Sequence, residues 1–194
     1  MKNDIILAGV GGQGILSIAA IIGYAAVGSG LYLKQAEVHG MSQRGGAVQS
    51  HLRISDTQIY SDLIPGGSAR LVLSVEPMES LRYLPYLSKE GWLITNTKSV
   101  INIKNYPGQD ALYQKISELP RQIMLPADDI ARDIGASRAM NMVMLGAGSP
   151  QIEVSYEQLQ QGIRFIFSRK GEAVVTSNLK ALDAGRVFAQ ERMS

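Results

Sequence analysis

The fold is decided by residues 4–14, which read DIILAGVGGQG. After Asp4 the run to Ala8 is apolar throughout, as expected of a strand that is covered on both faces of a parallel sheet. The glycines that follow predict a tight turn into a helix over 15–27, and the segment Gly28-Ser29-Gly30 ends that helix. A second strand is predicted over 31–34. This order of elements is typical of a doubly wound α/β fold.

The stretch from Ile5 to Leu33 contains no charged residue, which raises the question of a membrane helix or an export signal. Four glycines and Gln13 interrupt its first part, and so many glycines disfavour a continuous helix. A buried strand followed by a buried helix explains the same residues. We therefore expect neither a transmembrane span nor a cleavable signal, and a cytoplasmic location.

Strands and helices continue to alternate up to residue 125, and the last third is mostly helical. The range 35–46 is predicted as a loop, and a β-hairpin is expected over 47–54 and 58–64. The other expected elements are strands over 71–75, 92–95 and 123–125, helices over 77–87 and 108–119, a helix capped by Ser155 and Gln158, and a last helix from Glu172. We expect one domain over 1–194, with a Rossmann-like, doubly wound, mostly parallel sheet, a β-hairpin insertion and a helical C-terminal third.

Composition excludes several classes of protein. The 19 basic and 17 acidic residues give a net charge of +2, and aromatic residues make up 6%, so neither the field nor the stacking surface of a nucleic-acid binder is present. The chain has no cysteine, which excludes a disulfide framework, a thiolate nucleophile and cysteine ligands for zinc or an iron–sulfur cluster. The aspartates at 128, 129 and 133 are explained as acids at a helix start, so no metal site is predicted.

The glycine turn is the first candidate site. It matches G-x-G-x-x-G after a strand and before a helix, where backbone N–H groups and the helix dipole stabilise an anion. The alternative is that the glycines only permit close packing of strand and helix. A dinucleotide site also requires an acid at the end of the second strand, and Glu37 lies about three residues late for that role. The candidate anion-binding or coenzyme A-binding residues are Gly9, Gly11, Gly12, Gln13 and Gly14.

A second motif, EVHGMSQRGG, occupies residues 37–46. Its loop is expected at the carboxyl edge of the sheet, beside the glycine turn. Arg44 has the geometry to bind a carboxylate or phosphate through two hydrogen bonds, and the His39 imidazole can donate a hydrogen bond to the same group. The alternative is an internal Glu37–Arg44 ion pair that only orders the loop. The candidate ligand or interface residues are Glu37, His39, Ser42, Gln43, Arg44, Gly45 and Gly46.

Together, the glycine turn and the second motif resemble the gamma-type subunit of 2-oxoacid:ferredoxin oxidoreductases, and within that family the small (beta) subunit of the indolepyruvate enzymes. The similarity extends over most of the chain. It continues through Pro65-Gly66-Gly67 and the ranges 76–79, 141–146 and 178–185.

The resemblance implies a subunit of an enzyme that converts an aryl 2-oxoacid, coenzyme A and oxidised ferredoxin into acyl-CoA, carbon dioxide and reduced ferredoxin. Thiamine diphosphate, Mg²⁺ and [4Fe–4S] clusters are then expected on a larger partner subunit, because this chain has no cluster ligands and no thiamine diphosphate motif. We expect no cofactor on this chain alone and little activity without the partner. Coenzyme A and ferredoxin act through the complex, and the phosphates of coenzyme A suit Arg44 and the glycine turn.

Three alternatives remain at this stage. The chain is a free-standing dinucleotide-binding module that uses Glu37 on a ribose, a gamma subunit of a pyruvate or 2-oxoglutarate enzyme, or a purely architectural subunit. No residue is assigned as a proton-transfer catalyst. His51, on a predicted strand, is expected at the surface or an edge of the sheet.

Overall fold

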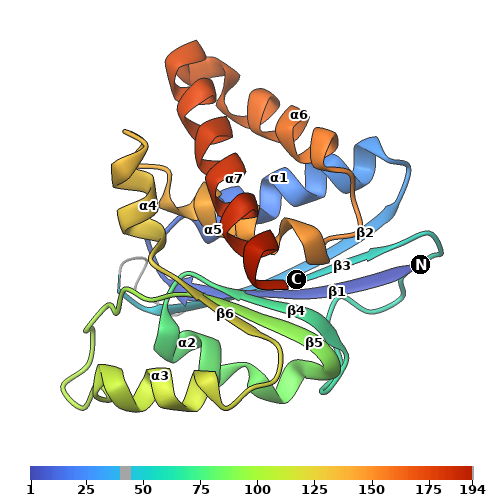
Figure 1. Cartoon of the computed structure of the whole chain (residues 1–194). Coiled ribbons are helices and arrows are strands. Elements are labelled where there is room, and N and C mark those ends of the chain that lie inside the picture. Colours follow the sequence, from blue (N-terminus) through green and yellow to red (C-terminus); the bar gives the residue numbers. More distant parts are fainter. Residues whose placement is uncertain (40–44, 194) are drawn as a thin grey trace.

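The computed structural model describes residues 1–39 and 45–193, which form one six-stranded sheet in the order β2-β3-β1-β4-β5-β6 (Figure 1). Strands β1, β4, β5 and β6 are parallel to one another, whereas β3 is antiparallel to both β1 and β2. The doubly wound, mostly parallel α/β fold is therefore confirmed. The strands are β1 (Lys2–Val10), β2 (Tyr32–His39), β3 (Ala47–Ser55), β4 (Ala69–Ser74), β5 (Leu87–Asn96) and β6 (Gln122–Leu125).

Helices cover both faces of the sheet. Figure 1 shows α1 (Ile15–Gly28), α5 (Met140–Gly148), α6 (Tyr156–Phe167) and α7 (Glu172–Met193) on one face. The other face carries α2 (Pro77–Arg82) and α3 (Gln109–Ser117), while α4 (Ala127–Asp133) follows β6. Strand β1 is buried on both faces, because Ile5 and Leu7 belong to one apolar cluster and Ile6 and Ala8 to the other.

The expected β-hairpin exists, but its second strand was assigned wrongly. Strand β3 pairs with β2, with Lys34 opposite Arg53, and the predicted strand over 58–64 is not a strand. Strand β2 also extends to His39, so the predicted loop over 35–46 starts too early. The helix predicted over 77–87 is shorter as well, because a 3-10 turn at Leu84–Tyr86 follows α2 and β5 begins at Leu87.

Residues 58–64 do not pair with β3 because β1 and β2 occupy both of its edges, and side chains of β3 bind this segment instead. The guanidinium of Arg53 donates to the carbonyls of Ser61 and Leu63, both at 2.9 Å. The Nδ1 atom of His51 accepts from the backbone N–H of Ile64 at 3.0 Å. These two β3 side chains satisfy backbone groups that a strand would have used for ladder hydrogen bonds.

His51 is thus a buried residue, contrary to the expectation of a surface position, and it makes stability depend on pH. Burial, and then the nearby Arg53, lower the pKa of His51 from 6.5, while Asp4 acts in the opposite direction. The unfolded chain binds the proton more readily, so this stabilisation is complete above the unfolded pKa and is lost as pH falls through the lowered folded pKa. We expect the urea concentration at the unfolding midpoint to be lower at pH 5 than at pH 7. The difference between the two pH values should be smaller in His51→Gln. An equal slope in both proteins would assign the effect to other groups.

Candidate functional site

The glycine turn lies at the carboxyl edge of the sheet, between β1 and α1. Gly12 and Gly14 have φ values of 99° and 83°, a region that favours glycine. A Cβ atom on Gly9 would lie 2.3 Å from the Val75 side chain, and one on Gly14 would lie 2.4 Å from the Asn141 amide. Gly9 and Gly14 therefore permit close packing. Gly12 has open space around it, so its backbone is accessible to a ligand.

Gln13 connects the carboxyl ends of β1 and β4. Its Oε1 atom accepts from the backbone N–H of Val10 at 2.8 Å, and its Nε2 atom donates to the carbonyl of Val75 at 3.1 Å. Chain connections leave β1 and β4 toward opposite sides of the sheet, so their carboxyl ends border the crevice where ligands bind in such folds. With both ends of its amide engaged, Gln13 positions the turn, and an anion there would meet backbone N–H groups.

The second motif reaches the glycine turn, as its predicted place at the carboxyl edge requires. The N–H of Gly11 donates to the carbonyl of Gly46 at 2.8 Å, and the N–H of Gly45 points to the carbonyl of Gly11 at 3.5 Å. Glu37 lies on β2, exposed and opposite Ser50, and the backbone of His39 pairs with Val48. The candidates Ser42, Gln43 and Arg44 lie outside the described residues, as does the alternative Glu37–Arg44 ion pair.

A buried carboxylate that the sequence analysis did not single out organises the adjacent segment 97–108. Glu76 is completely buried directly after β4, and it caps α2 by accepting from the N–H of Glu79 at 2.8 Å. It also accepts from the N–H of Val100 at 3.3 Å and from the Tyr106 hydroxyl. Glu76 thereby fixes two points of a segment that contains no helix or strand. The sequence signal for the cap was the proline that follows it.

Between these two anchors, Asn102 contacts the second motif. Its Nδ2 atom donates to the carbonyl of Gly45 at 2.7 Å. Gly45 and Gly46 are consequently held from two sides, by Gly11 of the glycine turn and by Asn102.

Removing this contact is expected to loosen the Gly45–Gly46 backbone. In Asn102→Ala, loss of one hydrogen bond worth about 1 kcal/mol should speed local opening by roughly fivefold. Hydrogen exchange of the amides of Gly45 and Gly46 measures this directly. Asn105→Ala is the matched control, because Asn105 is exposed on the same segment. Equal exchange in both variants would show that Asn102 does not hold the motif.

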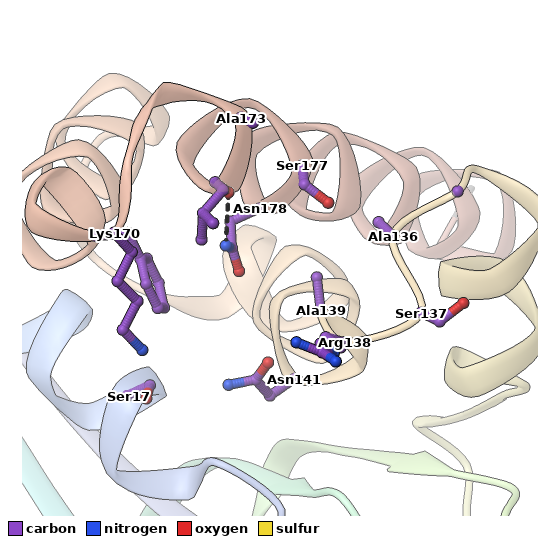
Figure 2. Close-up of a pocket in the computed structure, with 13 residues that line it drawn as sticks. Ser17, Ala136, Ser137, Arg138, Ala139, Asn141, Lys170, Ala173, Ser177 and Asn178 are labelled. Atoms are coloured by element: carbon purple, nitrogen blue, oxygen red, sulfur yellow. Dashed lines mark hydrogen bonds between the residues drawn. The ribbon is translucent and has the colours of Figure 1, made fainter.

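A pocket of about 640 Å³ lies near the glycine turn, on the face of the sheet that carries α1, α5 and α7 (Figure 2). Figure 2 shows Arg138, Lys170 and Asn141 directed into the space between α1, α5 and α7, with Ser17 of α1 at its border. Two cations and no carboxylate line the pocket. The first turns of α1 and α5, which border it, carry no acidic residue, whereas α7 carries Glu172 in its first turn. The pocket therefore favours an anionic ligand.

The pocket is joined to the turn and has fixed polar walls. Asn141 donates from Nδ2 to the carbonyl of Gly14 at 3.2 Å. The buried Asn178 donates to the carbonyl of Val174 at 2.8 Å, as Figure 2 shows. The Lys170 ammonium lies 5.2 Å from the centre of the Phe167 ring. Sequence reasoning missed Arg138 and Lys170, since they are 32 positions apart and belong to no local motif.

Among residues 1–39 and 45–193, no three histidine, aspartate or glutamate side chains are grouped so that they could hold a metal ion. In the same part of the chain, no helix combines the length and apolarity needed to cross a bilayer. Asp128, explained above as an acid at a helix start, lies in the first turn of α4, where it accepts from Asn96 at 2.9 Å and pairs with Lys98 at 3.0 Å.

Comparison with known proteins agrees with this architecture. Indolepyruvate oxidoreductase subunit IorB of Archaeoglobus fulgidus is 37% identical in an alignment of 194 positions, which covers 95% of this chain and 94% of that protein. Ketoisovalerate oxidoreductase subunit VorA of Methanothermobacter marburgensis is 30% identical over 96% of this chain but 36% of its own length. The solved gamma subunit of a keto/oxoacid ferredoxin oxidoreductase from Geobacter sulfurreducens superposes with a TM-score of 0.71 at 26% identity, covering 97% of this chain and 99% of that one. Residues 4–188 match the family model described as pyruvate ferredoxin/flavodoxin oxidoreductase, and the chain belongs to that family.

Proposed function

We propose that this chain is the small subunit of a 2-oxoacid:ferredoxin oxidoreductase that acts on indolepyruvate or a related aryl 2-oxoacid. The observation that carries the proposal is the reciprocal coverage of IorB, in which nearly all of each chain aligns with the other. The complex would convert R–CO–COO⁻, coenzyme A and two oxidised ferredoxins into R–CO–S–CoA, CO₂, H⁺ and two reduced ferredoxins.

The cofactors of this reaction belong on a larger partner subunit in the proposal. A [4Fe–4S] cluster needs cysteine thiolates, and the chain has none, so its residues do not fit a cluster. Thiamine diphosphate with Mg²⁺ needs oxygen ligands for the metal, and the described residues offer no grouped set of carboxylates. This chain then contributes no redox step, and no residue of it is assigned a proton transfer.

Its contribution would be to bind and orient the phosphates of coenzyme A. The backbone at Gly12 is open, and Asn141 links the cationic pocket of Arg138 and Lys170 to the turn through its hydrogen bond to the Gly14 carbonyl. Arg44 of the second motif would add a further bidentate phosphate contact. Phosphate groups spread along one ligand match such a row of backbone and side-chain donors.

The position of Glu37 is unfavourable for the alternative of a dinucleotide-binding module. In such modules the second strand lies beside the first, which places its terminal acid near the ribose. Here β3 lies between β1 and β2, so Glu37 is two strands away from the glycine turn. Titration of the isolated chain with NAD, FAD and coenzyme A separates the two functions, because micromolar binding of a dinucleotide would favour the module.

Reconstitution tests the proposed division of labour. The isolated chain should show no turnover, and activity should return with the larger thiamine-binding subunit. In the complex, the double variant Arg138→Ala/Lys170→Ala should raise the KM for coenzyme A about tenfold and leave the KM for the oxoacid unchanged. Arg169→Ala, which removes an exposed cation next to the pocket, is the control. Turnover by the chain alone would refute the division of labour. An unchanged KM for coenzyme A together with weakened assembly would refute the ligand role.

A further inference from the structure

The outer face of α1 is apolar along its whole length. Leu16, Ala20, Tyr24 and Val27 are all exposed, with Leu16 at 53% and Val27 at 62% of their full exposure. Their spacing of four, four and three positions places them on one side of a helix. They extend over roughly 16 Å at 1.5 Å per residue.

Helix α6 enlarges this face. Phe165 is 61% exposed, and its ring stacks on that of Tyr24 with the centroids 4.6 Å apart and the planes 22° apart. These five exposed residues are all uncharged, and the contact between Tyr24 and Phe165 connects the two helices. We name it the α1 patch: Leu16, Ala20, Tyr24, Val27 and Phe165.

The composition of α1 shows that this exposure is unusual within the molecule. Among the helices of the described chain, α1 and α5 contain no charged residue. Helix α5 lies in the core, where seven of its nine residues are buried. Helix α1 covers the sheet with one side and presents the α1 patch with the other. A helix that is apolar on both sides is normally covered on both, and contiguous apolar patches mark interaction sites.

We propose that the α1 patch is the docking surface for the larger subunit of the oxidoreductase complex, an inference that rests on the proposed function. In VorA, the counterpart of this whole chain makes up 36% of a longer polypeptide. Further segments of the VorA polypeptide are therefore available to cover the counterpart of the α1 patch there. The larger subunit would take the place of those segments on the present chain.

The position of the α1 patch fits this occupant. Leu16 is two residues from Gly14, so a subunit docked there would border the glycine turn and the pocket. A ligand held at the turn would then lie next to the partner that carries the reaction. Because the α1 patch has no charged side chain, its complement on the partner should be apolar, with aliphatic and aromatic side chains.

One substitution at two positions tests the docking surface. Val27→Lys places a charge in the α1 patch, whereas Val187→Lys places it on α7 at a valine that is 55% exposed outside the patch. In sedimentation with the larger subunit, Val27→Lys should raise the Kd about tenfold or more and Val187→Lys less than about twofold. Phe165→Glu should act like Val27→Lys. The wild-type Kd should change less than about threefold between 0.1 and 1 M NaCl, since apolar contacts are not screened.

Each other outcome overturns the proposal in a distinct way. Equal assembly of both lysine variants would show that the partner binds elsewhere. A homodimer of the isolated chain that Val27→Lys dissociates, with normal binding of the larger subunit, would assign the α1 patch to a second copy. If the wild-type chain does not associate with the larger subunit at all, the proposed function fails and the docking surface fails with it. If the complex oxidises the 2-oxoacid and Val27→Lys binds the larger subunit as tightly as wild type, the docking proposal is refuted and the proposed function is not.

Discussion

Replacing Arg53 by alanine is expected to lower the free energy of unfolding by about 3 kcal/mol, at the lower end of the cost of removing one partner from a buried ion pair. Arg53 is almost fully buried, and its Nε and Nη2 atoms donate to the two carboxylate oxygens of Asp4 at 2.8 and 3.3 Å. The substitution leaves the buried Asp4 carboxylate with the exposed Lys2 ammonium, which lies 3.1 Å away. It also frees the carbonyls of Ser61 and Leu63. Urea unfolding monitored by circular dichroism measures the loss.

Two companion variants show whether burial is the cause. Arg132→Ala removes an arginine from an exposed pair with Asp129 and should cost less than about 1 kcal/mol. The double variant Asp4→Asn/Arg53→Met removes both charges, and its loss should be smaller than the sum of the two single losses. Equal costs for Arg53→Ala and Arg132→Ala would contradict the assignment of a buried pair.

Gly185→Ala should destabilise the chain by about 3 kcal/mol or more, at the upper end of overpacking effects. A Cβ atom on Gly185 of α7 would lie 1.9 Å from the carbonyl oxygen of Val143 in α5. The contact is reciprocal, because a Cβ atom on Gly146 of α5 would lie 2.0 Å from the carbonyl oxygen of Leu182 in α7. Both obstacles are backbone atoms, so the two helices must separate. Thermal unfolding should show the loss.

The control is Gly28→Ala at the end of α1, where an added Cβ meets no atom within 4 Å. Alanine favours helix over glycine, so this variant should equal or exceed wild-type stability by up to about 1 kcal/mol. Gly146→Ala should resemble Gly185→Ala. The double variant should lose less than the sum, because the first methyl group already separates the helices. A stable Gly185→Ala variant would show that α5 and α7 are not in glycine contact.

Elements specified by neighbouring residues could be predicted from the sequence. The strand expected over 4–8 lies within β1, and the helix expected over 15–27 is α1 with one residue added. The capping box of Ser155 and Gln158 is present as predicted, with both of its hydrogen bonds. In each case the signal was local: an apolar run, a glycine turn, or a cap at fixed spacing.

Pairing between distant segments could not be predicted in the same way. Strand β3 pairs with β1 and β2 on its two edges, and the buried side chains of Arg53 and His51 bind the backbone of the segment that follows it. The alternation of apolar and polar residues over 47–54 does not indicate those partners. The hairpin was therefore placed on the wrong side of β3.

The candidate site likewise contains features that the sequence predicts and features that depend on contacts between distant segments. The place of the second motif at the carboxyl edge was predicted, but its contact between Gly11 and Gly46 continues the β1–β3 ladder beyond Val10 and Ala47, a pairing that the sequence did not indicate. The pocket of Arg138 and Lys170 joins segments more than 100 positions from Ser17, and it exists only once α5 and α7 have docked. The anchoring of segment 97–108 on Glu76 likewise needed the three-dimensional arrangement.

The glycine contact between α5 and α7 also sets the order in which the subunit matures during synthesis. Helix α7 follows every other element in the chain, so the backbone of α5 stays uncovered until residue 185 has left the ribosome. Helix α1 is translated far earlier and stays without its neighbour α6, and without the partner proposed for the α1 patch, until those are made. The nascent polypeptide therefore exposes an uncharged helix for most of its translation, and exposed apolar surface of this kind favours aggregation until later elements cover it.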